Sequence, residues 1–528
     1  MPENHDHPES TGGVSAASPR GTDALTETGA QTLAGAAQNP PAATQSPPTT
    51  AQNPAAAAQN PAAVAQGPPA APPVPGATPQ PKVRRRPEWV WSAPSPELPA
   101  PREGKWHAAI DGITDARALE HGGTFVGAAV RGRGHKQDAL YCDDSFSFLD
   151  IGGWKVVMVS DGAGSAVFSR VGSQIVCDAV RDVFERELCA VDLSTHTLAE
   201  SRLKDIQAAP AADPFLARAA AAFERAFASA YRDVKDWVNE QNRDHNEGNA
   251  TRQWVEKQFR GTEKELPRVV PDRPTAPLRL LEKDCNCTLL VTAYGVIRLD
   301  KADGTQRDMA LSLSCAIGDG MMVVLRSGNA TPRVIALMTP DAGEFAGQTQ
   351  FVDAKTTETS AIRARLKLSF LGKPTDVVAV AAMTDGVADD YYEGTLGMER
   401  LYCDLVLNGI LPTNPGPQAD LLIDVSEAAL RSVVGDESVF EQRPADGTSR
   451  TRPVKYSQRY LELKKMSVGQ LLSNADLLDL IARSEPDTAQ EQSGLSPAWQ
   501  ADRLRDWLDT YIVIGSFDDR SLSMYMTK

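Results

Sequence analysis

Several apolar segments of strand length in this chain stop at an aspartate. The segments are 154–160, 309–318, 376–383 and 511–517, and the aspartates that follow them are Asp161, Asp319, Asp385 and Asp518. Aspartate and glycine both suit turns, and the chain contains six Asp-Gly pairs, so one such ending indicates only a turn. Several endings together predict that carboxylates gather at one edge of a sheet core. Such an edge places negative charges side by side, so it favours a positively charged ligand.

The pattern of apolar residues predicts an α+β fold. Strands are expected at 124–130, 287–299, 309–318, 321–328, 332–338, 376–383, 511–517 and 521–527, with a hairpin at 145–159 that turns at Gly152-Gly153. Helices are expected at 169–188, from Asp213-Pro214 onward, at 420–434 and at 499–511. The strands between 287 and 338 predict an antiparallel meander. Strands thus come in hairpins and helices in pairs, unlike the strict β-α alternation of a doubly wound sheet.

Composition divides the chain near residue 95. Residues 1–95 are rich in Ala, Pro, Gln, Thr and Gly and contain imperfect repeats of AQNPAA. A segment with so little apolar surface cannot offset the entropy of ordering, so we expect a disordered arm. One domain is expected at 96–528, with insertions near 242–280 and 435–500. The first of these is polar and holds four prolines, which predicts an exposed insertion.

Charge and cysteine content exclude several classes of protein. The net charge is −15 and the pI is about 5.1, which argues against nonspecific binding to nucleic acid. No apolar run approaches the roughly 20 residues of a membrane span, and the polar N-terminus lacks a signal segment. The seven cysteines show no disulfide framework and no CxxC pair. We therefore expect a monomeric cytoplasmic protein that binds neither membrane nor nucleic acid.

Clustered carboxylates favour a divalent metal ion. Carboxylates repel one another, and their burial is costly unless a positive charge lies among them. Mg²⁺ and Mn²⁺ prefer carboxylate, carbonyl and water oxygens. Gly162 fits this interpretation, because a residue without a side chain lets its carbonyl approach a metal closely. Arg131 and Arg133 lie upstream, and a guanidinium matches the oxygens of a phosphate.

Six short motifs, in order over roughly residues 120–528, resemble the PP2C-type metal-dependent Ser/Thr protein phosphatases. They are RGRGHKQDA (131–139), VSDGAGSAVFSRVGSQ (159–174), NCTLL (286–290), AIGDG (316–320), AMTDGVADD (382–390) and GSFDDRSL (515–522). The DGAGS start of the second motif is closest to the bacterial branch of the family. The resemblance implies a four-layer α/β/β/α sandwich with two central antiparallel sheets.

The resemblance also implies roles for individual residues around two Mn²⁺ or Mg²⁺ ions. Asp161 would bridge the two ions, Gly162 would bind one through its carbonyl, and Asp385 and Asp518 would complete the first. Gln137 and Asp138 would hold waters of the second ion, and Arg133 would bind the substrate phosphate. Asp319 and Asp389 would help to form a weaker third metal site. The implied mechanism is direct attack on phosphorus by a metal-bridging hydroxide, without a phosphoenzyme.

The chain departs from the family pattern at two positions. Gln137 stands where many relatives carry Glu, and Ala163 stands where eukaryotic relatives carry a His proposed as general acid. His135 is the nearest histidine, and we interpret it as an ordinary loop residue. We therefore expect a metal-bound water to protonate the leaving group, and a slow turnover.

The sequence is interpreted as a phosphatase that acts on phosphoserine and phosphothreonine in proteins, with a cognate Ser/Thr kinase as a further partner. Two alternatives remain open at this point. One is a catalytically weak or inactive scaffold that binds phosphoproteins. The other is a metal phosphatase for small phosphoesters, because the substrate cleft of this family is built from insertions whose sequence does not identify a substrate.

Overall fold

The computed structural model describes part of the chain. The described residues are 112–243, 249–271, 276–327, 332–338, 349–389, 391–392, 398, 401–402, 405, 410–411, 496–510 and 518–527. The chain divides into two compact units, 1–83 and 84–528, and all described residues belong to the second. The predicted arm, the helix at 420–434, the strand at 511–517 and most of the insertion at 435–500 lie outside the described residues.

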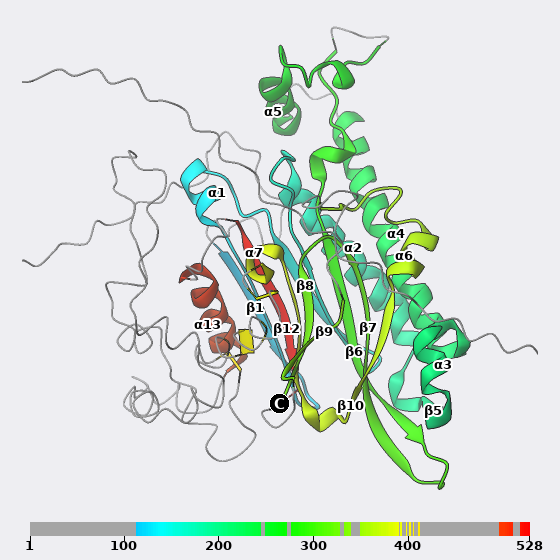
Figure 1. The fold of residues 1–528 in the computed structure, drawn as a ribbon. Coiled ribbons are helices and arrows are strands. Elements are labelled where there is room, and N and C mark those ends of the chain that lie inside the picture. The colour runs from blue at the N-terminus through cyan, green and yellow to red at the C-terminus, as the bar shows by residue number, and fades with distance from the viewer. Residues whose placement is uncertain are drawn as a thin grey trace, which may run out of the picture. The chain divides into compact units, whose positions relative to one another are not determined.

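Two sheets form the centre of the second unit (Figure 1). The first contains, in spatial order, β1 (Gly112–Ala118), β2 (Thr124–Val130), β12 (Arg520–Met526), β11 (Val377–Met383), β8 (Met321–Arg326) and β9 (Val334–Ala336). The second contains β10 (Lys367–Gly372), β7 (Gln306–Ile317), β6 (Leu289–Asp300), β4 (Trp154–Ser160) and β3 (Ser145–Ile151), with β5 (Thr197–Ala199) beside β6. Every neighbouring pair is antiparallel except β5 with β6.

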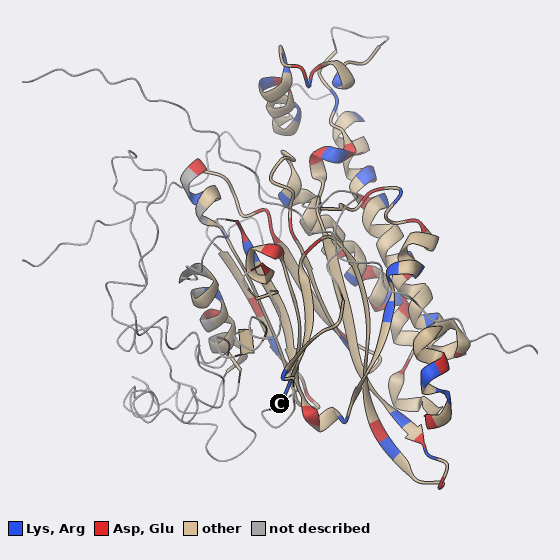
Figure 2. Ribbon diagram, viewed as in Figure 1, with Lys and Arg blue, Asp and Glu red and all other residues tan. Residues whose placement is uncertain are grey.

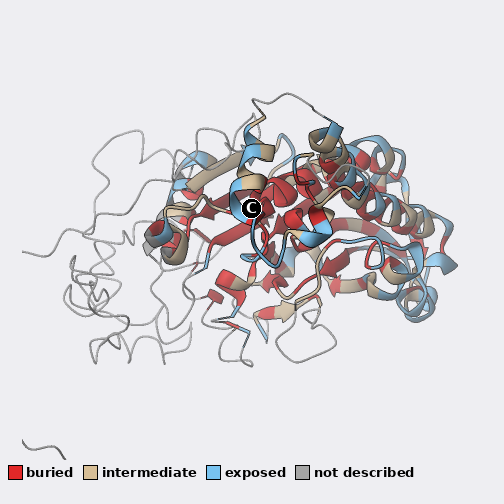
Figure 3. Ribbon diagram, turned by 90° about the horizontal axis from the view of Figure 1, so that it is seen from above, coloured by how far each residue is buried: buried red, intermediate tan, exposed pale blue. Residues whose placement is uncertain are grey.

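Helices cover the outer faces of both sheets. On the second sheet, α2 (Ser169–Glu187) and α4 (Pro214–Arg243) share one apolar core with β4, β6 and β7. On the first sheet, α13 (Pro497–Thr510) packs over β1 and β2. A third apolar cluster, which includes Phe146, Leu290 and Tyr525, lies between the sheets. The strands are largely buried, and exposed residues lie mostly on the outer helices and the loops (Figure 3). The α/β/β/α sandwich expected from the sequence is therefore confirmed.

Local chemistry explains where the main elements begin and turn. Asp213 accepts hydrogen bonds from the amides of Phe215 and Leu216, both at 3.0 Å, so it caps α4 as the Asp-Pro pair predicts. Gly152 and Gly153 join β3 to β4 with φ values of 57° and 80°, which a side chain would disfavour. The remaining described helices are α1 (Arg133–Asp138), α3 (Leu203–Ala208), α5 (Ala250–Phe259), α6 (Thr359–Arg365) and α7 (Asp385–Ala388).

Two expectations about the fold are wrong in part. The strands from 287 to 338 do not form one meander, because β7 belongs to the second sheet and β8 to the first. The stretch 242–280 is not simply exposed, because α5 buries Val255 and Phe259 in the same core as α2 and α4. No helix in the described part of the chain is long and apolar enough to cross a membrane.

Candidate metal centre

The predicted carboxylates lie at one end of the sandwich. Because neighbouring strands are antiparallel, the ends of β4, β7 and β11 and the starts of β3, β6, β8 and β12 share one edge. Asp161 follows β4, Asp319 joins β7 to β8, Asp385 follows β11, and Asp518 precedes β12. Figure 2 shows acidic segments at this end, beside α7. The structure thus brings together residues that are far apart in the sequence.

The electrostatics show that these carboxylates act on one another. Burial raises the pKa of Asp161 well above its usual value, and the charges of Asp144, Asp385 and Asp518 raise it further. Burial, together with the charges of Asp319, Asp518 and Asp389, raises the pKa of Asp385 to about 7. Without a cation between them, these carboxylates therefore take up a proton more readily than an isolated aspartate does.

The structure places a carboxylate beside Asp161 that was not among the predicted residues. Asp138 lies exposed at the end of α1, and the charges that shift the pKa of Asp161 belong to Asp144, Asp385 and Asp518. The carboxylate that faces Asp161 belongs to Asp144, which is 1% exposed and directly precedes β3. Burial, followed by the charge of Asp519, raises the pKa of Asp144 well above its usual value. The signal in the sequence was the acidic pair in CDDSF, immediately before a strong strand pattern.

Hydrogen bonds fix Asp144 between the two sheets. Its Oδ2 accepts a 2.8 Å hydrogen bond from Thr384 Oγ1, and the Ser521 amide donates to the same hydroxyl at 3.0 Å. Asp144 Oδ1 has no hydrogen-bond donor among the described residues, and the carboxylates of Asp144 and Asp161 can share a hydrogen bond only when one is protonated. The arrangement holds one oxygen of Asp144 in place and leaves the other buried without a donor among the described residues.

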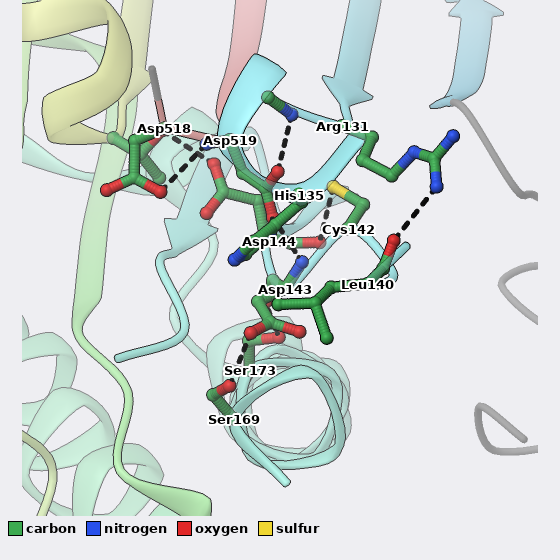
Figure 4. Close-up of polar contacts among 12 residues, drawn as sticks. Arg131, His135, Leu140, Cys142, Asp143, Asp144, Ser169, Ser173, Asp518 and Asp519 are labelled. Carbon is green, nitrogen blue, oxygen red and sulfur yellow. Dashed lines mark hydrogen bonds and ion pairs between the residues drawn. The ribbon is translucent and has the colours of Figure 1, made fainter. Parts of the chain in front are cut away.

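Asp143 is a second acidic residue that sequence reasoning missed. Figure 4 shows how it joins α2 to the cluster: Ser169 Oγ donates to its Oδ2, and Ser173 Oγ donates to its carbonyl, both at 2.6 Å. Burial raises the pKa of Asp143 to about 6. The charge of His135 opposes this rise, and the charge of Asp519 adds to it. Because its carboxylate binds the first turn of α2, Asp143 anchors the helix.

Gly162 occupies a position where only glycine fits. A Cβ built on it would lie 2.7 Å from the Asp143 carbonyl oxygen and 2.8 Å from Ser169 Cβ. The Asp161 carbonyl accepts from the Thr288 amide at 2.8 Å, and the Thr288 hydroxyl accepts from the Asp161 amide at 2.9 Å. The Asp161-Gly162 backbone is therefore held tightly against the start of β6.

The oxygen atoms available at this site suit a hard divalent cation. Buried carboxylate oxygens without donors, Asp144 Oδ1 and Asp319 Oδ1, are what such an ion would bind. In the described part of the chain, no three His, Cys, Asp or Glu side chains meet the geometry of a metal site by themselves. Mg²⁺ typically keeps several waters, so its coordination shell need not be completed by side chains. Asp319 Oδ2 already accepts a hydrogen bond from Thr349.

The remaining predicted residues differ in how far the structure places them. Arg133 and Gln137 belong to α1, and their side chains lie outside the described part. Asp389 is exposed at the end of α7, and partial desolvation with the charges of Asp319 and Asp518 raises its pKa. His135, interpreted as a loop residue, lies in α1 and donates to Asp519 at 2.8 Å.

Comparison with known proteins assigns the family. The sequence profile described as Protein phosphatase 2C matches residues 131–408, more than half of the chain. No curated protein sequence matches the chain significantly. Similar solved structures include a bacterial serine phosphatase, with 9% identity, a TM-score of 0.27, and coverage of 80% of this chain and 98% of that one.

Two further solved structures are similar at the same level. The serine/threonine phosphatase Stp1 from Staphylococcus aureus has 7% identity and a TM-score of 0.28, over 81% of this chain and 98% of that one. RsbX in complex with magnesium has 10% identity and a TM-score of 0.26, over 79% of this chain and 100% of that one. On the strength of the profile match, the chain belongs to the protein phosphatase 2C family.

Proposed function

We propose that this chain is a metal-dependent protein phosphatase that hydrolyses phosphoserine and phosphothreonine. The observation that carries the proposal is the convergence of Asp161, Asp144, Asp385 and Asp518 at one edge of the sandwich, with buried oxygens that lack donors. Burial of several carboxylates together is unfavourable without a cation. Membership of the protein phosphatase 2C family suggests that this cation serves phosphate hydrolysis.

The residues divide the work of holding two Mn²⁺ or Mg²⁺ ions. Asp161 would help to hold both ions, Asp385 and Asp518 would help to hold one of them, and we assign to Asp144 the role first expected for Asp138. The Gly162 carbonyl would complete the set, since no side chain at that position blocks it. When bound, the ions would activate a water for direct attack on phosphorus and neutralise the phosphate.

The chain's own residues would prepare that reaction in two ways. Arg133 would bind the substrate phosphate, because a guanidinium pairs with two of its oxygens. The hydrogen bonds of Thr384 and Thr288 hold Asp144 and the Asp161 backbone in place before any ion or substrate arrives. Ala163 follows Gly162 and carries no titratable group, so it cannot donate a proton to the leaving group.

The test is phosphate release from a phosphothreonine peptide by the full-length chain, in Mn²⁺ and in EDTA. We expect release in Mn²⁺, none in EDTA, and a loss of at least about 100-fold for Asp385→Asn. Release that survives EDTA, or that is unchanged by Asp385→Asn, would contradict the proposal. Metal binding without release from any phosphopeptide would instead favour a scaffold that binds phosphoproteins, and release only from small phosphoesters would exclude a protein substrate.

A further inference from the structure

Asp519 is a buried acceptor for three separate donors. It is 1% exposed, and its carboxylate accepts from the Gly132 amide at 2.5 Å, from the Asp143 amide at 2.5 Å and from His135 Nδ1 at 2.8 Å. Figure 4 shows His135 and Asp143 beside Asp519. Gly132 and Asp519 are 387 positions apart in the chain. One carboxylate thus joins the end of β2, helix α1 and the start of β3 to the start of β12.

Asp519 and its partner Asp143 are direct neighbours of candidate metal ligands. Asp143 precedes Asp144, and Asp519 itself follows Asp518. A Cβ on Gly132 would lie 2.2 Å from the Asp518 carbonyl carbon, so these backbones are in close contact. A shift of the Asp519 carboxylate would therefore move Asp144 and Asp518 relative to each other.

His135 is the side-chain donor in this group, and it stands in an acidic environment. Asp143, Asp518 and Asp519 all face it. Burial lowers the pKa of His135, but the hydrogen bond to Asp519 and the three carboxylate charges outweigh it and raise the pKa to about 10. The two amide donors are fixed by the backbone, whereas the imidazole can be replaced by mutation. Substitution of His135 can therefore test what the hydrogen bonds to Asp519 contribute.

We propose that His135 is a positioning residue for the metal centre: its Nδ1–H holds the Asp519 carboxylate in place, and through it sets Asp144 and Asp518 at the spacing that the metal ions require. This inference rests on the proposed function for its link to catalysis. It needs no contact between His135 and the substrate. Residues that orient metal ligands typically change metal affinity or activity by about 10–100-fold when they are removed.

The experiment compares two substitutions at His135 in the full-length protein. His135→Ala removes the donor, whereas His135→Asn keeps an amide N–H near the place of Nδ1. The control is His196→Ala, since His196 also pairs with an aspartate, Asp213, but beside β5 at the other end of β6. The readouts are Mn²⁺ affinity by calorimetry, kcat and KM for a phosphothreonine peptide, and amide hydrogen exchange over residues 131–145 without metal.

We expect His135→Ala to weaken Mn²⁺ binding by about 10–100-fold, to lower kcat more than it changes KM, and to speed exchange over 131–145. His135→Asn and His196→Ala should stay close to wild type in all three. Unchanged Mn²⁺ affinity and exchange in a folded His135→Ala protein would overturn the inference. So would a folded His135→Asn protein as impaired as His135→Ala, because the imidazole would then act by more than its hydrogen bond.

The outcomes also separate this inference from the proposed function. If wild type binds Mn²⁺ but releases no phosphate, the proposed function fails, while the affinities of the variants still decide the role of His135. If wild type binds no Mn²⁺, the metal centre itself is wrong and the inference falls with it. Faster exchange over 131–145 would then show only a structural hydrogen bond.

Discussion

Asp144 shows what a sequence pattern can and cannot locate at the scale of one residue. Asp161, Asp385 and Asp518 were predictable because each adjoins a long apolar segment whose end is plain in the sequence. Asp138 was predicted from its spacing to an arginine, and spacing does not reveal that α1 ends there and leaves the side chain exposed. The chain then runs on to Asp143 and Asp144 before β3 begins.

Substitutions at Asp138 and Asp144 test which of the two aspartates serves the metal centre. We expect Asp144→Asn to weaken Mn²⁺ binding and phosphate release by about 10–100-fold or more, because it removes a charge that faces Asp161. Asp138→Asn should leave both unchanged, since Asp138 is exposed. Calorimetry and phosphate release measure the two effects. The reverse order of the two variants would restore the original assignment.

Ala139 carries a backbone conformation that alanine disfavours. Its φ of 57° and ψ of 36° place it in the left-handed region, as the residue that ends α1. No other non-glycine residue in the described part of the chain has a positive φ. We expect Ala139→Gly to raise the free energy of unfolding by about 0.5–1 kcal/mol, as measured by denaturant unfolding. A loss of stability would show that the Ala139 methyl group contributes packing that outweighs the strain.

At the scale of elements, the spacing of apolar residues predicted where most helices and strands lie, but not how all of the strands are connected. The helices α2 and α4 and most strands lie where their apolar spacing placed them. The path from β7 to β8 was missed because the turn Gly318-Asp319-Gly320 has the length of a hairpin. A Cβ on Gly318 would lie 2.5 Å from Thr288 Cβ, and one on Gly320 2.4 Å from the Met383 carbonyl oxygen. This turn passes from one sheet to the other. The spacing of strands in the sequence does not reveal such a crossing, because it depends on tertiary structure.

The insertion near 242–280 is tied to the core by a buried ion pair. Arg268 donates to both oxygens of Asp284 at 2.6 Å and 2.5 Å, and its guanidinium lies 3.7 Å from the Phe259 ring centroid. Arg268→Met would leave Asp284 buried without its cation, so we expect a loss of about 3–5 kcal/mol in the free energy of unfolding. The control is Arg363→Met, because Arg363 forms an exposed pair with Glu224. That change should cost much less than Arg268→Met, because water screens an exposed pair; equal losses would mean that Asp284 does not depend on Arg268.

At the scale of the molecule, the acidic edge predicts how stability depends on pH. Asp143 and Asp385, with pKa values raised to about 6 and about 7, bind more protons in the folded than in the unfolded protein. His135, raised to about 10, has the same sign above its unfolded pKa of about 6.5. In EDTA, the contribution of these three groups to the free energy of unfolding should therefore fall as the pH rises from about 4 to about 8.

Mn²⁺ should reverse that trend, because the ion binds only the deprotonated carboxylates. The measurement is the thermal unfolding midpoint at pH 5.5 and pH 7.5, in EDTA and in Mn²⁺. In EDTA the midpoint should be lower at pH 7.5, and the gain on adding Mn²⁺ should be larger at pH 7.5. A midpoint that rises with pH in EDTA would mean that these carboxylates are not buried together.

The place of β12 in the first sheet has a consequence for how the chain reaches this structure. It lies between β2 and β11, and it follows β2 by several hundred residues. Until β12 inserts, both neighbours keep an unpaired edge, and closing so long a loop slows the pairing. A folding intermediate with two open edges is prone to join other copies through them. Refolding should therefore be slow and lose yield as protein concentration rises, and the same late step would complete the acidic edge, since it delivers Asp518 and Asp519.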